Sequence, residues 1–170
     1  PPEVTEDMPG EQVLLDVNSL AEGHDFFALG ASTVSDSGDL LAYSVDVAGD
    51  ERFELFIKDL RTGELLEDRL TGIFYGATWV GEEYIFYTTV DDAWRPDTVW
   101  RHRVGTPQSE DVVVVCEEDS LFGLGVGTTP SEKYIMIVSG SKTTNEAWVL
   151  EQSTPEGEFR CLWERESGVD

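Results

Sequence analysis

The sequence predicts an all-β fold of about three four-stranded antiparallel blades of a β-propeller, preceded by a short helical linker. Short runs rich in Val, Ile, Tyr, Phe, Trp and Thr alternate with turn clusters such as SDSGD, RTGE and TPEGE. Strand clusters that begin at Leu40, Tyr84 and Tyr134 can also be laid over one another, with offsets of 44 and 50 residues. A period of about 40 to 50 residues that holds four strands is typical of propeller blades.

The third observation is that several predicted strands are apolar at consecutive positions, as in YIFYTTV, VVVVC and YIMIVSG. A sheet with one solvated face would instead alternate apolar and polar residues. A blade that lies between two neighbouring blades buries both of its faces. Continuous apolar strands are therefore what a propeller requires.

The elements follow in order along the chain. The predicted units are a linker (1–26) and three blades (27–70, 71–119 and 120–166). Segment 11–23 of the linker has apolar residues at helical spacing and can form a short helix. The strands expected in the first blade lie at about 27–35, 40–47, 52–60 and 64–70. Gly38 and Gly63 fall in predicted hairpin turns, where a positive φ is often needed.

The basic run Arg101-His102-Arg103 lies in the predicted third strand of the second blade. Because side chains alternate along a strand, Arg101 and Arg103 point to one face and His102 to the other. Carboxylates are abundant in this chain, so we expect the two arginines to form salt bridges or interface contacts rather than to bind a ligand.

The charge is strongly negative: 11 Lys and Arg against 35 Asp and Glu give a net charge of −24. Such a surface excludes nucleic acid as a partner and would attract cationic ligands. No apolar run reaches the roughly 18 residues of a membrane helix, and the start has no signal-peptide pattern. The 2 cysteines are too few for a disulfide framework. We therefore expect a soluble, cytoplasmic protein with free thiols, and the Pro-Pro start without Met suggests a piece of a longer chain.

The motifs of common active sites are missing from the sequence. It contains no G-x-S-x-G nucleophile elbow, and GLGVGTTPSEK lacks the Gly-Lys-Ser/Thr ending of a phosphate loop. His24 and His102 cannot form a three-histidine zinc site. No catalytic residue, metal site or cofactor is therefore predicted for this chain.

Two motifs carry a resemblance to a known family. VWRHRVGTP (99–107) and SKTTNE (141–146), within similarity that extends from about Glu11 onward, resemble the amino-terminal part of the prolyl oligopeptidase family, in its oligopeptidase B (protease II) branch. The first turn has SDSG where the family usually has Ser-Pro-Asp-Gly, and the third blade opens with GLGVGTTPSEK where a polar run is common. Neither departure changes the assignment.

The resemblance implies a seven-bladed propeller placed like a lid over an α/β-hydrolase domain. The Ser, Asp and His of the catalytic triad would lie on that domain, beyond Asp170, so this chain alone would be non-catalytic. The implied activity of the parent protein is serine-type hydrolysis of short peptides after Arg or Lys, with the lid as a size filter. Its partners would be its own hydrolase domain and short, cationic peptides. An aromatic residue of the propeller lines the substrate pocket in the prolyl branch, and FYTT places Phe86 near it.

Other functions stay open at this point. The chain could be a free-standing propeller-type protein-binding module, which a downstream G-x-S-x-G in the gene would argue against. A propeller enzyme that uses acidic side chains, like some glycosidases, is a third reading and predicts activity from the purified chain. In every case, a chain of three blades leaves bare apolar faces on the first and third blades. We therefore expect it to self-associate.

Overall fold

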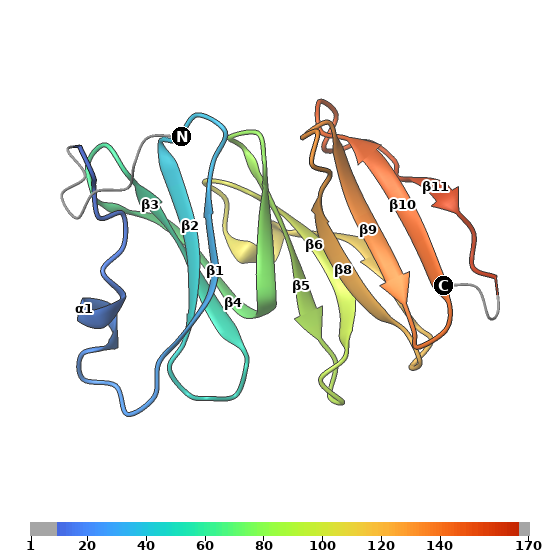
Figure 1. Cartoon of the computed structure of the whole chain (residues 1–170), viewed down its shortest axis with the longest axis horizontal. Helices are drawn as coiled ribbons and strands as arrows, with labels where there is room; N and C mark the ends of the chain where they lie inside the picture. Colours follow the sequence, from blue (N-terminus) through green and yellow to red (C-terminus); the bar gives the residue numbers. More distant parts are fainter. Residues whose placement is uncertain (1–9, 167–170) are drawn as a thin grey trace, which may run out of the picture.

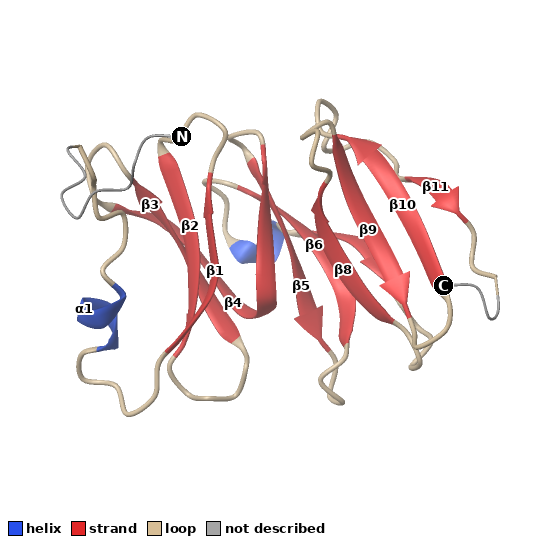
Figure 2. Ribbon diagram, in the orientation of Figure 1, coloured by secondary structure: helices blue, strands red, loops and turns tan. Residues whose placement is uncertain are grey.

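A computed structural model describes residues 10–166 of the chain, so residues 1–9 of the predicted linker lie outside the described part. The elements in chain order are α1 (Val17–Ala21), β1 (Ala28–Val34), β2 (Leu40–Asp46), β3 (Phe53–Asp59), β4 (Leu65–Val80), β5 (Tyr84–Val90), β6 (Pro96–Arg103), the short 3-10 helix η1 (Gln108–Glu110), β7 (Val112–Cys116), β8 (Gly123–Thr128), β9 (Tyr134–Gly140), β10 (Asn145–Glu151) and β11 (Arg160–Trp163). Strands dominate the molecule (Figure 2). The predicted all-β fold of antiparallel propeller blades is confirmed.

The strands follow one another as simple meanders. Strands β1 to β7 form one sheet in sequence order, β8 to β11 form a second, and every paired neighbour is antiparallel. The sheets follow one another along the long axis of the molecule (Figure 1). We refer to β1–β3 with the first part of β4 as the first blade, to the last part of β4 with β5–β7 as the second, and to β8–β11 as the third.

Strand β4 is shared by the first two blades. It is 16 residues long, and Leu70 in its first part pairs with Leu55 of β3, whereas Val80 at its end pairs with Tyr84 of β5. Gly72 has a φ of 68° within the strand, a conformation that glycine adopts without strain. The chain thus bends from one blade into the next without leaving the sheet. The predicted boundary between residues 70 and 71 falls inside this strand, and the exact blade limits stay a prediction.

The second blade is buried on both faces. One core cluster includes Ile85 and Tyr87 of β5 and joins the second blade to the first. The other includes Tyr84 and Phe86 of the same strand and joins the second blade to the third. Successive residues of β5 therefore enter different cores, which confirms the reason given for its continuous apolar sequence.

The outer face of the first blade is partly covered by the N-terminal segment. Tyr43 and Phe56 stack on this face with their ring centroids 5.7 Å apart. The segment is held there by Lys58, whose Nζ donates to the carbonyl oxygen of Leu14 at 2.9 Å. Its helix is shorter than segment 11–23 and begins after Asp16, whose carboxylate caps it. At the opposite end of the molecule, all four residues of β11 are exposed.

The turns between the first two strands of a blade repeat in detail. In the first blade the N–H of Gly38 donates to the carbonyl of Ser35 at 2.9 Å, and in the third blade the N–H of Glu132 donates to that of Thr129 at 2.8 Å. Gly38 has a φ of 81° and Glu132 a φ of 55°. The third blade therefore places a glutamate in the left-handed conformation that the first blade gives to glycine.

Candidate functional site

Phe86 lies inside the protein. It is fully buried (0% exposed) in the core between the second and third blades, and its ring meets that of Phe159 edge-on at 6.4 Å. The residue comes from the centre of β5, where the strand is covered on both faces. Its assignment to a substrate pocket stays a prediction, and the burial of the ring argues against it.

Arg101 and Arg103 contact different partners. Arg103 is exposed, and its Nη2 lies 3.6 Å from Oε2 of Glu83 in an exposed ion pair. Arg101 donates from Nη1 to the carbonyl oxygen of Pro155 at 2.9 Å, and its guanidinium lies 5.7 Å from the ring centroid of Tyr84. Exposed ion pairs contribute at most about 1 kcal/mol. Arg101 thus joins the second blade to the connection between β10 and β11 in the third blade, whereas Arg103 forms only an exposed contact within the second blade.

An open groove of about 670 Å³ lies beside these arginines, between the turn 80–84 and the connection 152–157. Its carboxylates already have partners. Glu82 accepts from the N–H and the Oγ of Ser37, at 2.5 and 2.9 Å. Glu156 accepts from the phenol of Tyr84 at 2.7 Å, and this hydrogen bond raises the pKa of that phenol. The groove is acidic, but its charges connect loops of neighbouring blades.

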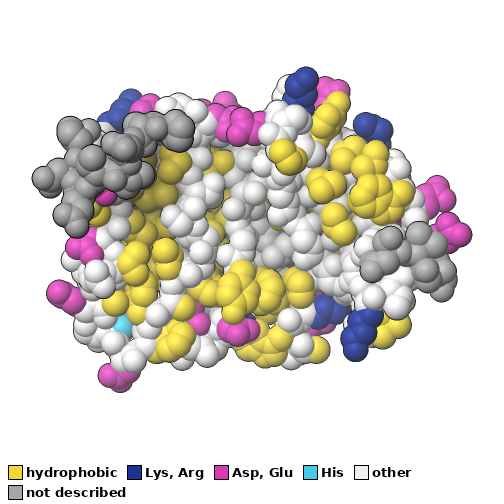
Figure 3. All heavy atoms as spheres, viewed as in Figure 1, with side chains coloured by type: hydrophobic (Ala, Val, Ile, Leu, Met, Phe, Trp, Pro, Cys, Tyr) yellow, Lys and Arg dark blue, Asp and Glu magenta, His cyan; other side chains and the backbone are white. Residues whose placement is uncertain are grey.

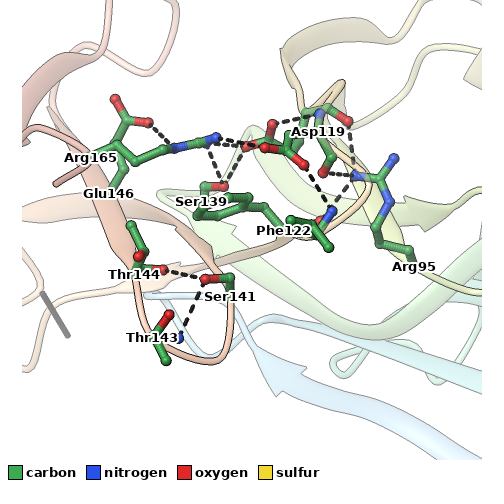
Figure 4. Close-up of polar contacts among 11 residues, drawn as sticks. Arg95, Asp119, Phe122, Ser139, Ser141, Thr143, Thr144, Glu146 and Arg165 are labelled. Atoms are coloured by element: carbon green, nitrogen blue, oxygen red, sulfur yellow. Dashed lines mark hydrogen bonds and ion pairs between the residues drawn. The ribbon is translucent and has the colours of Figure 1, made fainter. Parts of the chain in front are cut away.

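Several polar side chains meet at the junction between the second and third blades (Figure 4). Arg95, at the start of β6, reaches across to the connection that enters the third blade. Its Nη1 donates to the carbonyl oxygens of Glu117, Asp119 and Phe122 at 2.9, 3.2 and 3.0 Å. Its Nε donates to Asp91 at 3.0 Å. One side chain thus fixes the path of the chain from 117 to 122.

Arg165 approaches the same connection from the third blade. Its Nη2 donates to Glu117 at 2.5 Å and to Ser139 at 3.2 Å, and its Nε donates to Glu146 at 3.2 Å (Figure 4). The guanidinium also lies 3.7 Å from the ring centroid of Phe122. Such charge-assisted hydrogen bonds are about twice as strong as neutral ones. Arg165 therefore joins three segments of the chain that are distant in sequence.

Glu117 is the acceptor at the centre of this network. It is largely buried, and it accepts from the hydroxyl of Ser139 at 2.5 Å as well as from Arg165. Burial alone would raise the pKa of Glu117, but the hydrogen bonds from Ser139 and Arg165 lower it below its usual value. The carboxylate thus stays ionised and holds the second blade to the third.

The SKTT motif of the third blade forms the turn next to this network. The hydroxyl of Ser141 donates to the carbonyl oxygen of Thr144 at 3.2 Å and accepts from the N–H of Thr143 at 3.4 Å (Figure 4). Serine side chains commonly close turns in this way. The motif thus places β10, and with it Glu146, against Arg165.

The chemistry of these sites is that of a scaffold. Within residues 10–166 no group of three or more His, Cys, Asp and Glu side chains could hold a metal ion. Cys116 and Cys161 are both free and exposed. No helix in the same range is long and apolar enough to cross a membrane. The functional feature is the junction between the second and third blades, which Arg95 and Arg165 hold together.

Sequence reasoning missed Arg95, Arg165 and Glu117. The available signal was the scarcity of basic residues, since only 11 are present. Arg95 and Arg165 each lie just outside a strand, since Arg95 precedes β6 and Arg165 follows β11. A lone arginine at a blade edge in so acidic a chain is a candidate for a buried ionic contact.

Comparison with known proteins gives a consistent result. Residues 2–169 match the family description "Prolyl oligopeptidase, N-terminal beta-propeller domain". Among curated relatives, the chain is 38% identical over 162 residues to Protease 2 of Moraxella lacunata. This alignment covers 94% of the chain and 24% of Protease 2. The chain is 37% identical over 170 residues to dipeptidyl aminopeptidase BI of Pseudoxanthomonas mexicana, at 96% and 23% coverage. The chain thus spans about a quarter of the length of these relatives.

Solved structures agree. Oligopeptidase B from Trypanosoma brucei, in a closed form with covalently bound antipain, is similar with a TM-score of 0.86 and 34% identity, over 98% of this chain and 24% of that one. Oligopeptidase B from Leishmania major has a TM-score of 0.88 and 29% identity, over 96% and 24%. The resemblance drawn from VWRHRVGTP and SKTTNE is therefore confirmed.

Proposed function

Because the chain belongs to the prolyl oligopeptidase family, whose amino-terminal β-propeller domain it matches, we propose that it is the non-catalytic lid and size filter of a serine oligopeptidase that cleaves short peptides after Arg or Lys. In this proposal the reaction takes place on an α/β-hydrolase domain of the same protein. This chain contributes no reacting group. Its task is to form a rigid wall that lets only short peptides reach the active site.

The observation that carries the proposal is the burial of the second blade between its neighbours. Ile85 and Phe86 enter different cores, and Arg95 and Arg165 add hydrogen bonds across one seam. A size filter must resist spreading when a folded protein presses against it. Continuous cores reinforced by polar contacts at the seam supply that resistance.

The preference for basic residues receives electrostatic support. The net charge of −24 creates a field that draws cationic peptides toward the protein. Acidic side chains are spread around the visible face rather than gathered at one point (Figure 3). We therefore expect the field to raise the rate of encounter rather than to select a particular residue. The association rate of an arginine-containing peptide with the complete protein should fall between low and high salt, and an unchanged rate would rule out steering.

A cytoplasmic location is part of the same proposal. Two free, exposed thiols are compatible with a reducing compartment.

The size filter is tested with the complete protein and two substrates. One is a short peptide that contains a single arginine, and the other is the same peptide placed in a loop of a folded carrier. We expect cleavage of the first and not of the second. The variant Arg165→Gln weakens the seam, so the complete protein that carries it should cleave longer peptides. The control variant is Arg160→Gln, which changes an exposed arginine on β11 and should not have this effect. Equal cleavage of both substrates by the unmodified protein would refute the filter.

The isolated chain provides the second test. It should hydrolyse neither substrate. Tight binding of a folded protein partner by the isolated chain would instead favour the free-standing binding module.

A further inference from the structure

His102 is a buried histidine whose two ring nitrogens both face carboxylates. The side chain is 0% exposed. Its Nδ1 lies 2.7 Å from Oδ1 of Asp111, and its Nε2 lies 3.0 Å from Oδ1 of Asp68. Asp68 belongs to the part of β4 that pairs with β3, whereas Asp111 lies between η1 and β7. The ring therefore lies between the first blade and the last connection of the second.

The hydrogen bonds around the ring determine its protonation state. Asp111 also accepts from the phenol of Tyr87 at 2.7 Å, and Asp68 also accepts from the N–H of Gly105 at 2.5 Å. Both carboxylates thus act as acceptors for other donors. A neutral imidazole has only one N–H, so one of its nitrogens would place a lone pair against a carboxylate oxygen. Only the imidazolium form donates to both.

We propose that His102 is a fixed imidazolium that clamps the first blade to the second, and that this clamp opens in alkaline solution. The surrounding contacts identify it as a seam. Gln108, from η1, accepts from the N–H of Thr71 and donates to its carbonyl oxygen, both at 3.0 Å. It also donates to the phenol of Tyr87 at 3.3 Å. The connection from Gly105 to Asp111 is thereby held onto β4 at two points, Gln108 and His102, and of these two only the histidine carries a charge that alkaline solution removes.

The direction of the pH effect follows from the environment of the ring. Burial alone would lower the pKa of His102, but the hydrogen bonds to Asp111 and Asp68 raise it to about 9. An unfolded histidine has a pKa of about 6.5. Because the folded value is the higher one, the stabilisation is fully present below about pH 6.5 and is lost as the pH rises through about 9.

The pKa values of Tyr87 and Asp68 are both displaced away from this window. Burial and the hydrogen bond to Asp111 raise the pKa of Tyr87 above its usual value. Burial acts to raise the pKa of Asp68, but the hydrogen bonds from His102 and Gly105 lower it overall. Deprotonation of the imidazolium is therefore the event that opens the clamp.

The protonation state is measured directly by nitrogen-15 NMR of the histidine rings in the full chain. The sequence contains 2 histidines, so the variant His24→Gln leaves signals from His102 alone. His24 is exposed in the N-terminal segment, and its replacement leaves the clamp intact. At pH 7.5 we expect two protonated ring nitrogens, both with slowly exchanging N–H protons. A single protonated nitrogen at this pH would overturn the proposal.

The mechanical role is measured by urea unfolding of the full chain between pH 6 and pH 10. In His24→Gln the equilibrium constant for unfolding should rise over this range by a factor on the order of a hundred. This factor follows from the difference between the pKa of His102 in the folded chain and its pKa in the unfolded chain. In His102→Gln the constant should be higher at pH 6, and most of the rise with pH should disappear. A rise of equal size in both variants would show that other groups cause it, which would refute the clamp. Should His102→Gln not fold, Asp68→Asn replaces it, with a downward shift of the His102 pKa in the NMR titration as the expected result and an unchanged pKa as the refuting one.

Discussion

Gly30 in β1 is a position where a single methyl group should disrupt the first blade. A Cβ atom built on this residue would lie 2.6 Å from Cδ1 of Phe53 and 2.6 Å from Oγ of Ser44. Both neighbours are buried, at 2% and 0% exposure, so neither side chain can swing into solvent. Oγ of Ser44 also accepts from the N–H of Ala31 at 2.8 Å. The substitution Gly30→Ala therefore displaces a core aromatic ring and strains a hydrogen bond at once.

The expected cost follows from these contacts. Overpacking of a filled core costs about 1 to 3 kcal/mol. Weakening the buried hydrogen bond to Ser44 adds about 0.5 to 1.5 kcal/mol. The lower entropy of the unfolded chain, once alanine replaces glycine, returns about 0.4 to 1 kcal/mol. We expect Gly30→Ala to lower the free energy of unfolding by about 2 kcal/mol.

The assay is equilibrium unfolding in urea, followed by tryptophan fluorescence. The matched control is Gly125→Ala in β8, where the new Cβ meets nothing within 4 Å, and it should be neutral or slightly stabilising. In the double variant Gly30→Ala with Phe53→Leu, the smaller side chain makes room for the methyl group. Its cost should therefore be less than the sum of the single costs. A loss below about 0.5 kcal/mol for Gly30→Ala would refute the steric reasoning, because the typical overpacking cost is larger.

Three further predictions concern other parts of the chain. Glu132→Gly should raise the free energy of unfolding by about 0.5 to 1 kcal/mol in thermal melts, because it gives the positive-φ turn residue the freedom that Gly38 has, and a decrease would contradict this. Glu117→Gln should lower it by about 1 to 3 kcal/mol, and a double-mutant cycle with Arg165→Met should show coupling of at least about 0.5 kcal/mol, whereas additive losses would mean that the pair does not interact. Light scattering of the purified chain should show self-association through the exposed outer strand of the third blade, which a Trp163→Lys substitution should weaken; a monomer at all concentrations would contradict it.

The fold was predictable because burial on both faces leaves a direct trace in sequence. In β5, four consecutive large apolar residues have no explanation in a sheet with one wet face. The repeat offsets then supplied the number of blades. This information is local, since each strand carries its own pattern.

The continuous strand β4 was not predictable in the same way. Thr71-Gly72 has the composition of a turn, and it directly follows the predicted end of the first blade at residue 70. Gly72 does have the positive φ of a turn residue, but the chain uses it to bend a strand rather than to end one. The sequence shows that a glycine can adopt a positive φ. Pairing with the neighbouring strands determines whether this conformation ends a strand or bends it.

For the polar side chains of β6, the sequence predicts the face of the strand on which each one lies but not the residue that it contacts. Alternation along β6 correctly separates His102 from its two arginine neighbours. The partners come from elsewhere: Glu83 lies in the preceding turn, Asp68 in β4, and Pro155 in the third blade. Nothing local to the basic run could identify them. His102, which alternation places on the face opposite the two arginines, is the residue at the clamp. From the sequence, Arg101 and Arg103 were instead the candidate contacts.

Scarcity of positive charge explains how the seams are built. With 35 acidic residues against 11 basic ones, most carboxylates cannot have a cationic partner, and the two partly buried arginines at the seam between the second and third blades each serve several acceptors. Arg95 holds three carbonyl oxygens and one carboxylate, and Arg165 contacts three carboxylates, counting the 3.9 Å ion pair with Asp119. Loss of one acceptor leaves the arginine with others, whereas loss of the arginine leaves several acceptors unpaired at once. The polar contacts of the seams therefore depend on a few cations, and the large acidic surplus is free to set the charge of the surface.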